Sequence, residues 1–100
     1  MTKTKLLNYL KSIKKELYKK YGIVSLGLYG SYAKDEATEL SDVDIFYERD
    51  KKFPLSSGLE FMGIDEKIAK DLEVSKVDFV SLEFMNPIIK HYAKKDFIYV

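Results

Sequence analysis

Apolar positions near the start of the chain repeat with the period of an α-helix. They follow one another at spacings of four, three and four residues: Leu6, Leu10, Ile13 and Leu17. Such spacing places the four side chains on one helix face. Thr2 or Thr4 can cap the start, and Gly22 suits the left-handed residue that follows a helix end. The pattern therefore predicts an amphipathic helix over residues 4–21.

Beyond Gly22 the pattern predicts strands that alternate with helices. Runs of apolar residues favour strands at 23–29, 42–47, 77–82 and 97–100. Helical patterns lie between them at 32–37, 58–73 and 86–94, the last one opened by Asn86-Pro87. The first strand is apolar enough to be buried on both faces, and a polar loop is expected over 48–57. One sheet with helices around it predicts an α/β or α+β domain.

Composition narrows the class of protein. A chain of 100 residues predicts one domain, 1–100. It has no Cys, which excludes a disulfide scaffold, a thiolate nucleophile and a Cys-ligated zinc. His91 is the single histidine, which excludes a multi-histidine metal cluster. The longest uncharged stretch, residues 21–33, is too short to span a bilayer, and no signal peptide is visible. We therefore expect a soluble, cytoplasmic protein with no membrane partner.

The formal net charge is only +1, but the charges are unevenly distributed. Residues 1–20 carry seven lysines and one acid, whereas residues 35–50 carry seven acids and one arginine. A lysine-rich helix face is most simply a solvated surface, and the alternative is a docking face for RNA or a partner protein. Bulk electrostatics therefore do not argue for direct nucleic-acid binding.

Three carboxylates interrupt the predicted strands. Asp42 and Asp44 are two residues apart, so their side chains leave the same strand face. Asp78 lies inside another apolar run and joins them if the two strands are neighbours. Strands disfavour Asp, and a hard divalent cation would neutralise such a group. The alternative is structural: Asp42 caps a turn and Asp78 protects a strand edge from aggregation.

A Gly-Ser pair follows the first predicted strand. Gly30 lets the backbone approach a ligand closely, and the Ser31 hydroxyl can donate to a phosphate at a helix start. The same pair is also an ordinary turn with a capping serine. The combination of motifs is more specific than either alone. Ten residues separate Gly30-Ser31 from Asp42-Val43-Asp44, and Asp78 follows on a later strand. Together they describe a phosphate cradle beside a divalent-metal site.

The segment GSYAKDEATELSDVD resembles the signature of the nucleotidyltransferase fold of the DNA polymerase β superfamily. The small size, SDVDIFYE, KVDFVSL and the closing NPIIKHYAKKDFIYV are similar to the minimal nucleotidyltransferase group. Members of that group are typically antitoxins paired with HEPN-domain ribonuclease toxins. The chain departs from the group at Lys34-Asp35, where an Arg-Gly pair is common. Asp35 is therefore expected to adopt a left-handed conformation, which Asp tolerates.

The resemblance implies a small mixed sheet flanked by helices, and an activity. Two Mg²⁺ ions, or Mn²⁺, would be held by Asp42, Asp44 and Asp78, and ATP would be the substrate. Gly30 and Ser31 would hold its β- and γ-phosphates. Asp78 would also help to take the proton of the acceptor hydroxyl. The expected reaction is AMP transfer to a tyrosine of the cognate HEPN toxin, which silences it.

Two other hypotheses stay open at this point. One is an antitoxin that occludes its toxin without chemistry, although all three carboxylates and Gly30-Ser31 are retained. The other is an RNA-binding module based on the basic helix, which the net charge and the core-like spacing of the aromatics disfavour. For a partner protein, the candidate docking surfaces are the helices predicted at 4–21 and 87–94. A homo-oligomer is a further alternative.

Overall fold

Helix α1 (Lys3–Tyr21) begins and ends where its capping residues predict. The computed structural model describes residues 1–54 and 58–100. The Thr2 hydroxyl accepts a hydrogen bond from the Lys5 backbone N–H at 3.2 Å, which satisfies one of the free donors of the first turn. At the other end, Gly22 has φ 69° and its N–H bonds back to the last helical carbonyls. The predicted end at Gly22 is confirmed, and of the two candidate caps at the start the structure uses Thr2.

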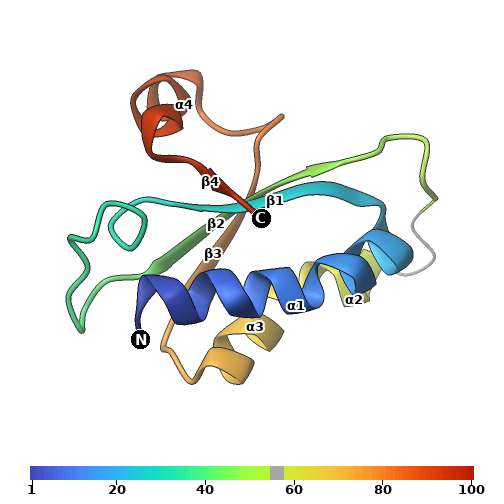
Figure 1. Cartoon of the computed structure of the whole chain (residues 1–100). Coiled ribbons are helices and arrows are strands. Elements are labelled where there is room, and N and C mark those ends of the chain that lie inside the picture. The colour runs from blue at the N-terminus through green and yellow to red at the C-terminus, as the bar shows by residue number, and fades with distance from the viewer. Residues whose placement is uncertain (55–57) are drawn as a thin grey trace.

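Four strands within the described residues form one mixed sheet in the order β3-β2-β1-β4 (Figure 1). They are β1 (Ile23–Tyr29), β2 (Val43–Arg49), β3 (Val77–Ser81) and β4 (Ile98–Tyr99). β1 pairs antiparallel with β2 and with β4, whereas β2 and β3 are parallel. The predicted α+β architecture and its small mixed sheet are confirmed.

Helices cover both faces of the sheet, but unequally (Figure 1). α1, α2 (Gly58–Met62) and α3 (Ile64–Leu72) lie on one face. α4 (Pro87–Ala93) and the short 3₁₀ helix η1 (Lys94–Asp96) lie on the other. In the described part of the chain, no helix is long and apolar enough to cross a membrane.

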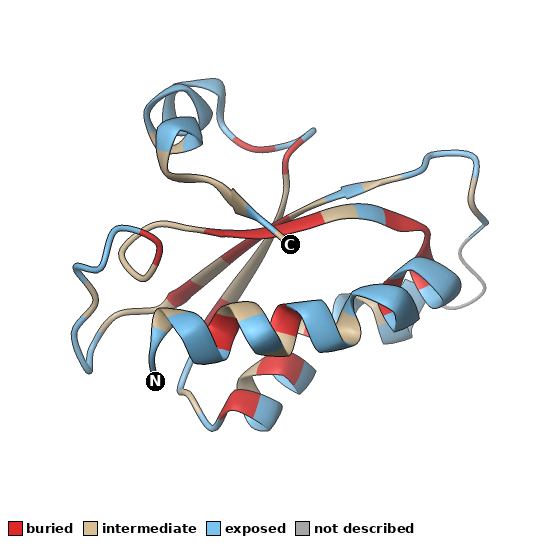
Figure 2. Cartoon of the chain, viewed as in Figure 1, coloured by how far each residue is buried: buried red, intermediate tan, exposed pale blue. Residues whose placement is uncertain are grey.

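The main core fills the space between the sheet and the three helices, where buried residues face one another (Figure 2). It contains the apolar stripe of α1, the inward side chains of α3 and one face of β1, β2 and β3. Its fully buried members include Leu6, Leu10, Leu26, Leu28, Val43 and Ile45. Side chains alternate between the two faces along β2, so Val43 and Ile45 point into the core and Asp44 between them points away.

A second, smaller cluster lies on the opposite face, beneath the segment that carries α4. Phe46, Leu82 and Met85 are its buried residues. The Phe46 ring stacks on Phe97 with ring centroids 4.4 Å apart. Gly27 leaves room for this ring, because a Cβ on Gly27 would collide with Phe46 and with the Ile98 carbonyl of β4. This half of β1 is therefore buried on both faces, as predicted, whereas Val24 near its start is exposed.

Several predicted boundaries were wrong. The helix expected at 32–37 is a hydrogen-bonded turn, because the bond from Glu36 N–H to the Ser31 carbonyl closes it after one turn. The helix expected at 58–73 breaks at Gly63 into α2 and α3. β2 continues through Arg49 into the predicted loop, since it pairs with Ile23 of β1. The remainder of that loop includes 55–57, which lie outside the described residues.

Two glycine substitutions test whether the second cluster depends on close packing. Gly27→Ala should destabilise the protein by about 1–3 kcal/mol, because its new methyl overpacks against Phe46 and the β4 backbone. Gly58→Ala is the control: its Cβ meets nothing within 4 Å, so the change should be neutral or slightly stabilising. Urea unfolding of both variants measures the difference. Equal stabilities would show that β4 yields freely to the added methyl.

Candidate active site

Strand register brings two of the predicted carboxylates together. Asp44 of β2 lies directly beside Asp78 of β3 in the parallel pair, and beside Tyr29 of β1 in the antiparallel pair. Since Val43 and Ile45 point into the main core, Asp44 points to the opposite face, the one that α4 occupies. The two carboxylates therefore lie next to each other on the less covered face of the sheet.

Asp42 joins this group through a lysine that sequence reasoning missed. The Lys76 ammonium lies 3.7 Å from Asp42 Oδ2 and 3.8 Å from Asp78 Oδ1. The Lys76 carbonyl also accepts a hydrogen bond of 3.2 Å from the Val43 N–H, which ties the starts of β2 and β3 together. The signal was available, because Lys76 stands two residues before Asp78 and side chains at that spacing share a face in extended chain.

The electrostatics of the group are dominated by unbalanced negative charge. Burial, the Asp78 and Asp42 charges and a hydrogen bond with Asp78 together raise the pKa of Asp44 to about 6, against the opposing effect of Lys76. Burial and the charges of Asp44 and Asp78 likewise raise the pKa of the neighbouring Tyr29 to about 12. The excess of negative charge therefore favours a positive charge beside these carboxylates, and the exposed Lys76 supplies only part of the charge needed for balance.

The backbone of the Gly30-Ser31 turn lies against the Asp44 carboxylate. Gly30 has φ 76°, and a Cβ there would collide with the Asp44 carboxylate. Both the backbone and the close approach therefore require glycine. Asp35 ends the turn with φ 60°, the left-handed conformation expected at this departure from the family pattern. Its carboxylate pairs with Lys3 at 2.9 Å, which attaches the turn to the start of α1.

The donor set suits a hard cation, because every side chain that could coordinate is a carboxylate. Within residues 1–54 and 58–100, however, no three acidic or histidine side chains are grouped closely enough to hold a metal ion. Asp44 and Asp78 are register neighbours, and Lys76 lies between Asp42 and Asp78. A bound cation would replace Lys76 as the counter-charge. The residues fit a metal by chemistry, and their side chains would have to draw together to hold it.

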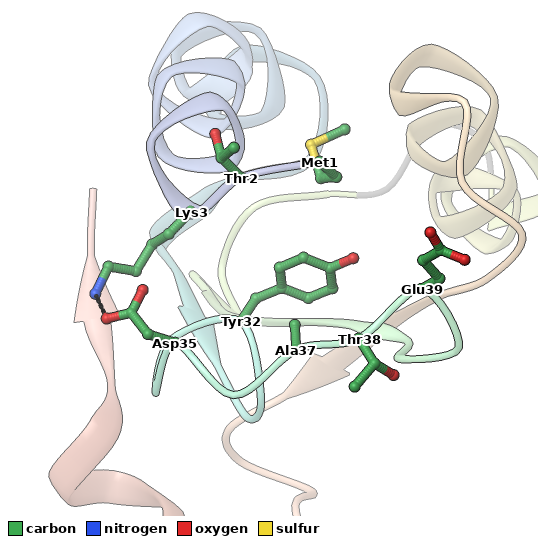
Figure 3. A pocket seen from close by; sticks show the side chains of 8 residues that line it. All are labelled: Met1, Thr2, Lys3, Tyr32, Asp35, Ala37, Thr38 and Glu39. Atoms are coloured by element: carbon green, nitrogen blue, oxygen red, sulfur yellow. Dashed lines mark hydrogen bonds and ion pairs between the residues drawn. The ribbon is translucent and has the colours of Figure 1, made fainter.

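A cavity of about 480 Å³ lies near the turn but apart from the carboxylates (Figure 3). It opens between the start of α1 and the segment 32–39, and the Tyr32 side chain extends across it. Asp42, Asp44 and Asp78 do not line it. The Asp42 and Asp78 side chains are instead 42% and 39% exposed. The carboxylate group thus lies at the surface of the sheet.

A mixed sheet with paired aspartates on its open face, beside a Gly-Ser turn, defines a nucleotidyltransferase fold. The sequence profile of the nucleotidyltransferase domain family matches residues 10–100, and the chain belongs to that family. It is therefore a nucleotidyltransferase, as the resemblance of its motif implied.

Full-length relatives are similar to this chain. It is 34% identical over 100 residues to "Putative protein adenylyltransferase MJ0126" of Methanocaldococcus jannaschii, covering 99% of this chain and 98% of that protein. It is 30% identical to "Protein adenylyltransferase MntA" of Thermococcus cleftensis, covering 100% and 97%. A crystal structure described as a toxin-antitoxin with AMP-PNP has the same fold, with a TM-score of 0.61 at 22% identity over 79% of this chain and 61% of that one.

The pKa of Asp44 predicts how stability depends on pH. The folded value, about 6, lies above the ordinary 3.8, so the folded protein holds this proton more tightly than the unfolded chain. The ionised carboxylate therefore lowers the free energy of unfolding progressively as pH rises from about 4 to 6. Above pH 6 the whole of this loss is present. Without metal, Asp44→Asn should be more stable than wild type at pH 7.5 by on the order of 1 kcal/mol, allowing for screening by water.

Thermal unfolding from pH 4 to pH 8 measures this effect. The advantage of Asp44→Asn should shrink as the pH falls through 6 and should vanish near 4. Glu39→Gln is the control, since Glu39 is exposed and lies outside the carboxylate group. A variant that is less stable than wild type at neutral pH would show that ionised Asp44 stabilises the fold.

Proposed function

We propose that this protein transfers AMP from ATP to a tyrosine hydroxyl of a HEPN-domain ribonuclease toxin and thereby silences it. The observation that carries the proposal is the pairing of Asp44 with Asp78 on an open face beside Gly30-Ser31. The names of the full-length relatives support protein adenylylation. The toxin-antitoxin structure with AMP-PNP supports a nucleotide and a toxin partner.

The turn after β1 is suited to the triphosphate. Its Gly30 presents backbone without a side chain next to Asp44. The Ser31 hydroxyl makes no hydrogen bond within the described part of the chain and is free to donate to a phosphate oxygen. We assign the β- and γ-phosphates to these two residues, which places the α-phosphate over the carboxylates.

Asp42, Asp44 and Asp78 would hold two Mg²⁺ ions, or Mn²⁺, which when bound supply positive charge that stabilises the phosphates during transfer. Asp78 is placed at the outer strand β3, where an incoming hydroxyl can reach it, and accepts the proton of that hydroxyl. The acceptor oxygen forms a bond to the α-phosphorus as the bond to pyrophosphate breaks. Binding of these ions would displace Lys76 from Asp42 and Asp78.

The acceptor hydroxyl comes from a partner protein, because this chain has few residues with which to enclose a small acceptor molecule. The Asp42 and Asp78 side chains are partly exposed on the sheet surface, and Asp44 beside them is half-buried. An open site suits a tyrosine presented by a folded surface. The second candidate is an antitoxin that only occludes the toxin; retention of the paired aspartates and of Gly30-Ser31 favours the enzyme.

Nucleotide binding should depend on the metal. Calorimetry with ATP should give at least tenfold weaker binding in EDTA than in Mg²⁺, because Mg²⁺ sites of this kind use substrate phosphates as ligands. Asp44→Asn should show the same weak binding with or without Mg²⁺. Tight ATP binding that is indifferent to EDTA would count against the proposed metal site.

AMP transfer should increase the mass of the toxin. Wild-type protein with Mg²⁺ and ATP should add about 329 Da per AMP to the toxin encoded beside its gene. Asp44→Asn and Asp78→Asn should reduce this by at least 100-fold, whereas Glu39→Gln should not. The modified toxin should stay inactive after it is separated from the antitoxin. A toxin of unchanged mass that regains ribonuclease activity on separation would favour occlusion instead.

A further inference from the structure

Helix α4 and the turn before it expose four large apolar side chains. None of its residues is buried. Ile88 and Tyr92 are 70% and 69% exposed, Ile89 is 54% exposed, and Phe84 in the preceding turn is 82% exposed. Single exposed apolar side chains are ordinary, but a contiguous group of them marks an interaction site. We call these four residues the α4 patch.

The α4 patch is held rigidly although it is exposed. Asn86 caps the helix, its side-chain oxygen accepting from the Ile88 and Ile89 N–H groups. Buried Met85 anchors the chain before the helix. Phe97 anchors it afterwards by stacking on Phe46. The helix is therefore fixed at both ends, and its apolar side chains are presented outward rather than left over from incomplete packing.

Of the two candidate docking helices, only α4 shares a face of the sheet with the carboxylates. Phe46 and Asp44 are two residues apart on β2 and point to the same side, over which α4 lies (Figure 1). Phe97 also contacts Tyr29, the register partner of Asp44. The segment that carries the α4 patch thus borders the site directly.

Other exposed apolar side chains include Tyr18 of α1, Val24 of β1, and Leu59 and Met62 of α2. Helix α2 lies with α1 on the face of the sheet opposite the carboxylates. Tyr18 of α1 and Val24 of β1 line a shallow cavity with three lysines of α1. Val24 lies five residues before Tyr29, which separates it from the carboxylate end of β1 by about 16 Å at the usual strand rise. α1 itself covers the opposite face of the sheet. A partner bound there would have to reach around the sheet to present a hydroxyl.

Charge indicates the chemistry of the partner. Lys90, Lys94 and Lys95 flank the α4 patch in the sequence. The two acids of the segment are each paired with a lysine outside it: Glu83 with Lys51, and Asp96 with Lys34 at 4.0 Å. A second copy of this chain would place these lysines against one another, which is unfavourable. A different protein with an apolar centre and an acidic rim complements the patch.

We propose that the α4 patch is the docking surface for the protein that supplies the acceptor hydroxyl, with the partner's acidic rim meeting the lysines of α4 and η1. This inference rests on the proposed function for the identity of that partner. It separates docking from catalysis, because the patch contains none of the carboxylates.

Two tyrosines provide a matched test. Tyr92→Glu alters the α4 patch, and Tyr18→Glu makes the same change at an exposed position of α1. Calorimetry with the toxin should show affinity at least tenfold lower for Tyr92→Glu and within twofold of wild type for Tyr18→Glu. Ile88→Glu should repeat the loss. Melting temperature and affinity for Mg²⁺ with ATP should be unchanged in all three.

The outcomes distinguish the two proposals. If Tyr18→Glu loses the toxin and Tyr92→Glu keeps it, the docking proposal is wrong and AMP transfer is untouched. If Tyr92→Glu loses the toxin although wild type adds no AMP, docking stands and the transfer proposal fails. If sedimentation shows a wild-type dimer that Tyr92→Glu dissociates while toxin binding persists, the patch is a self-association surface and the docking proposal is overturned.

Discussion

The candidate site is organised around two like charges that lie side by side in a β-sheet. Asp44 and Asp78 are register partners on parallel strands, so the pairing that builds the sheet keeps the two residues adjacent. Burial and mutual repulsion raise the pKa of Asp44, so the bare protein bears an electrostatic strain at this position. Lys76 relieves that strain in part, and a divalent ion would relieve it more fully.

The same strand supports the site and the core because its side chains alternate. Val43 and Ile45 are fully buried among α1 and α3, and this fixes the direction in which Asp44 must point. A shift of one residue in the register of β2 would bury Asp44 and expose Ile45. The hydrophobic core therefore positions the carboxylates, although it makes no contribution to the chemistry itself.

The two faces of the sheet have different roles in the molecule. The face that packs against α1, α2 and α3 contains most of the buried apolar side chains and stabilises the fold (Figure 2). The other face holds a smaller aromatic cluster around Phe46, next to the partly exposed carboxylates and the α4 patch. Such a division explains how a chain of 100 residues combines a stable core with an open candidate site. The candidate site and the proposed docking surface share the face that contributes less of the buried core.

Local pattern was enough to predict α1 with its end at Gly22 and most of the three longer strands, because each depends on neighbours in the chain. The left-handed Asp35 was expected from its departure from the family pattern. The family also followed from the sequence, since the spacing from Gly30-Ser31 to Asp42 and Asp44 is itself a local motif. The approach of Lys76 to both Asp42 and Asp78 and the separation of the two docking candidates were not predictable in this way. They depend on which strands pair and on which face each helix covers, and only tertiary contacts between distant segments decide that.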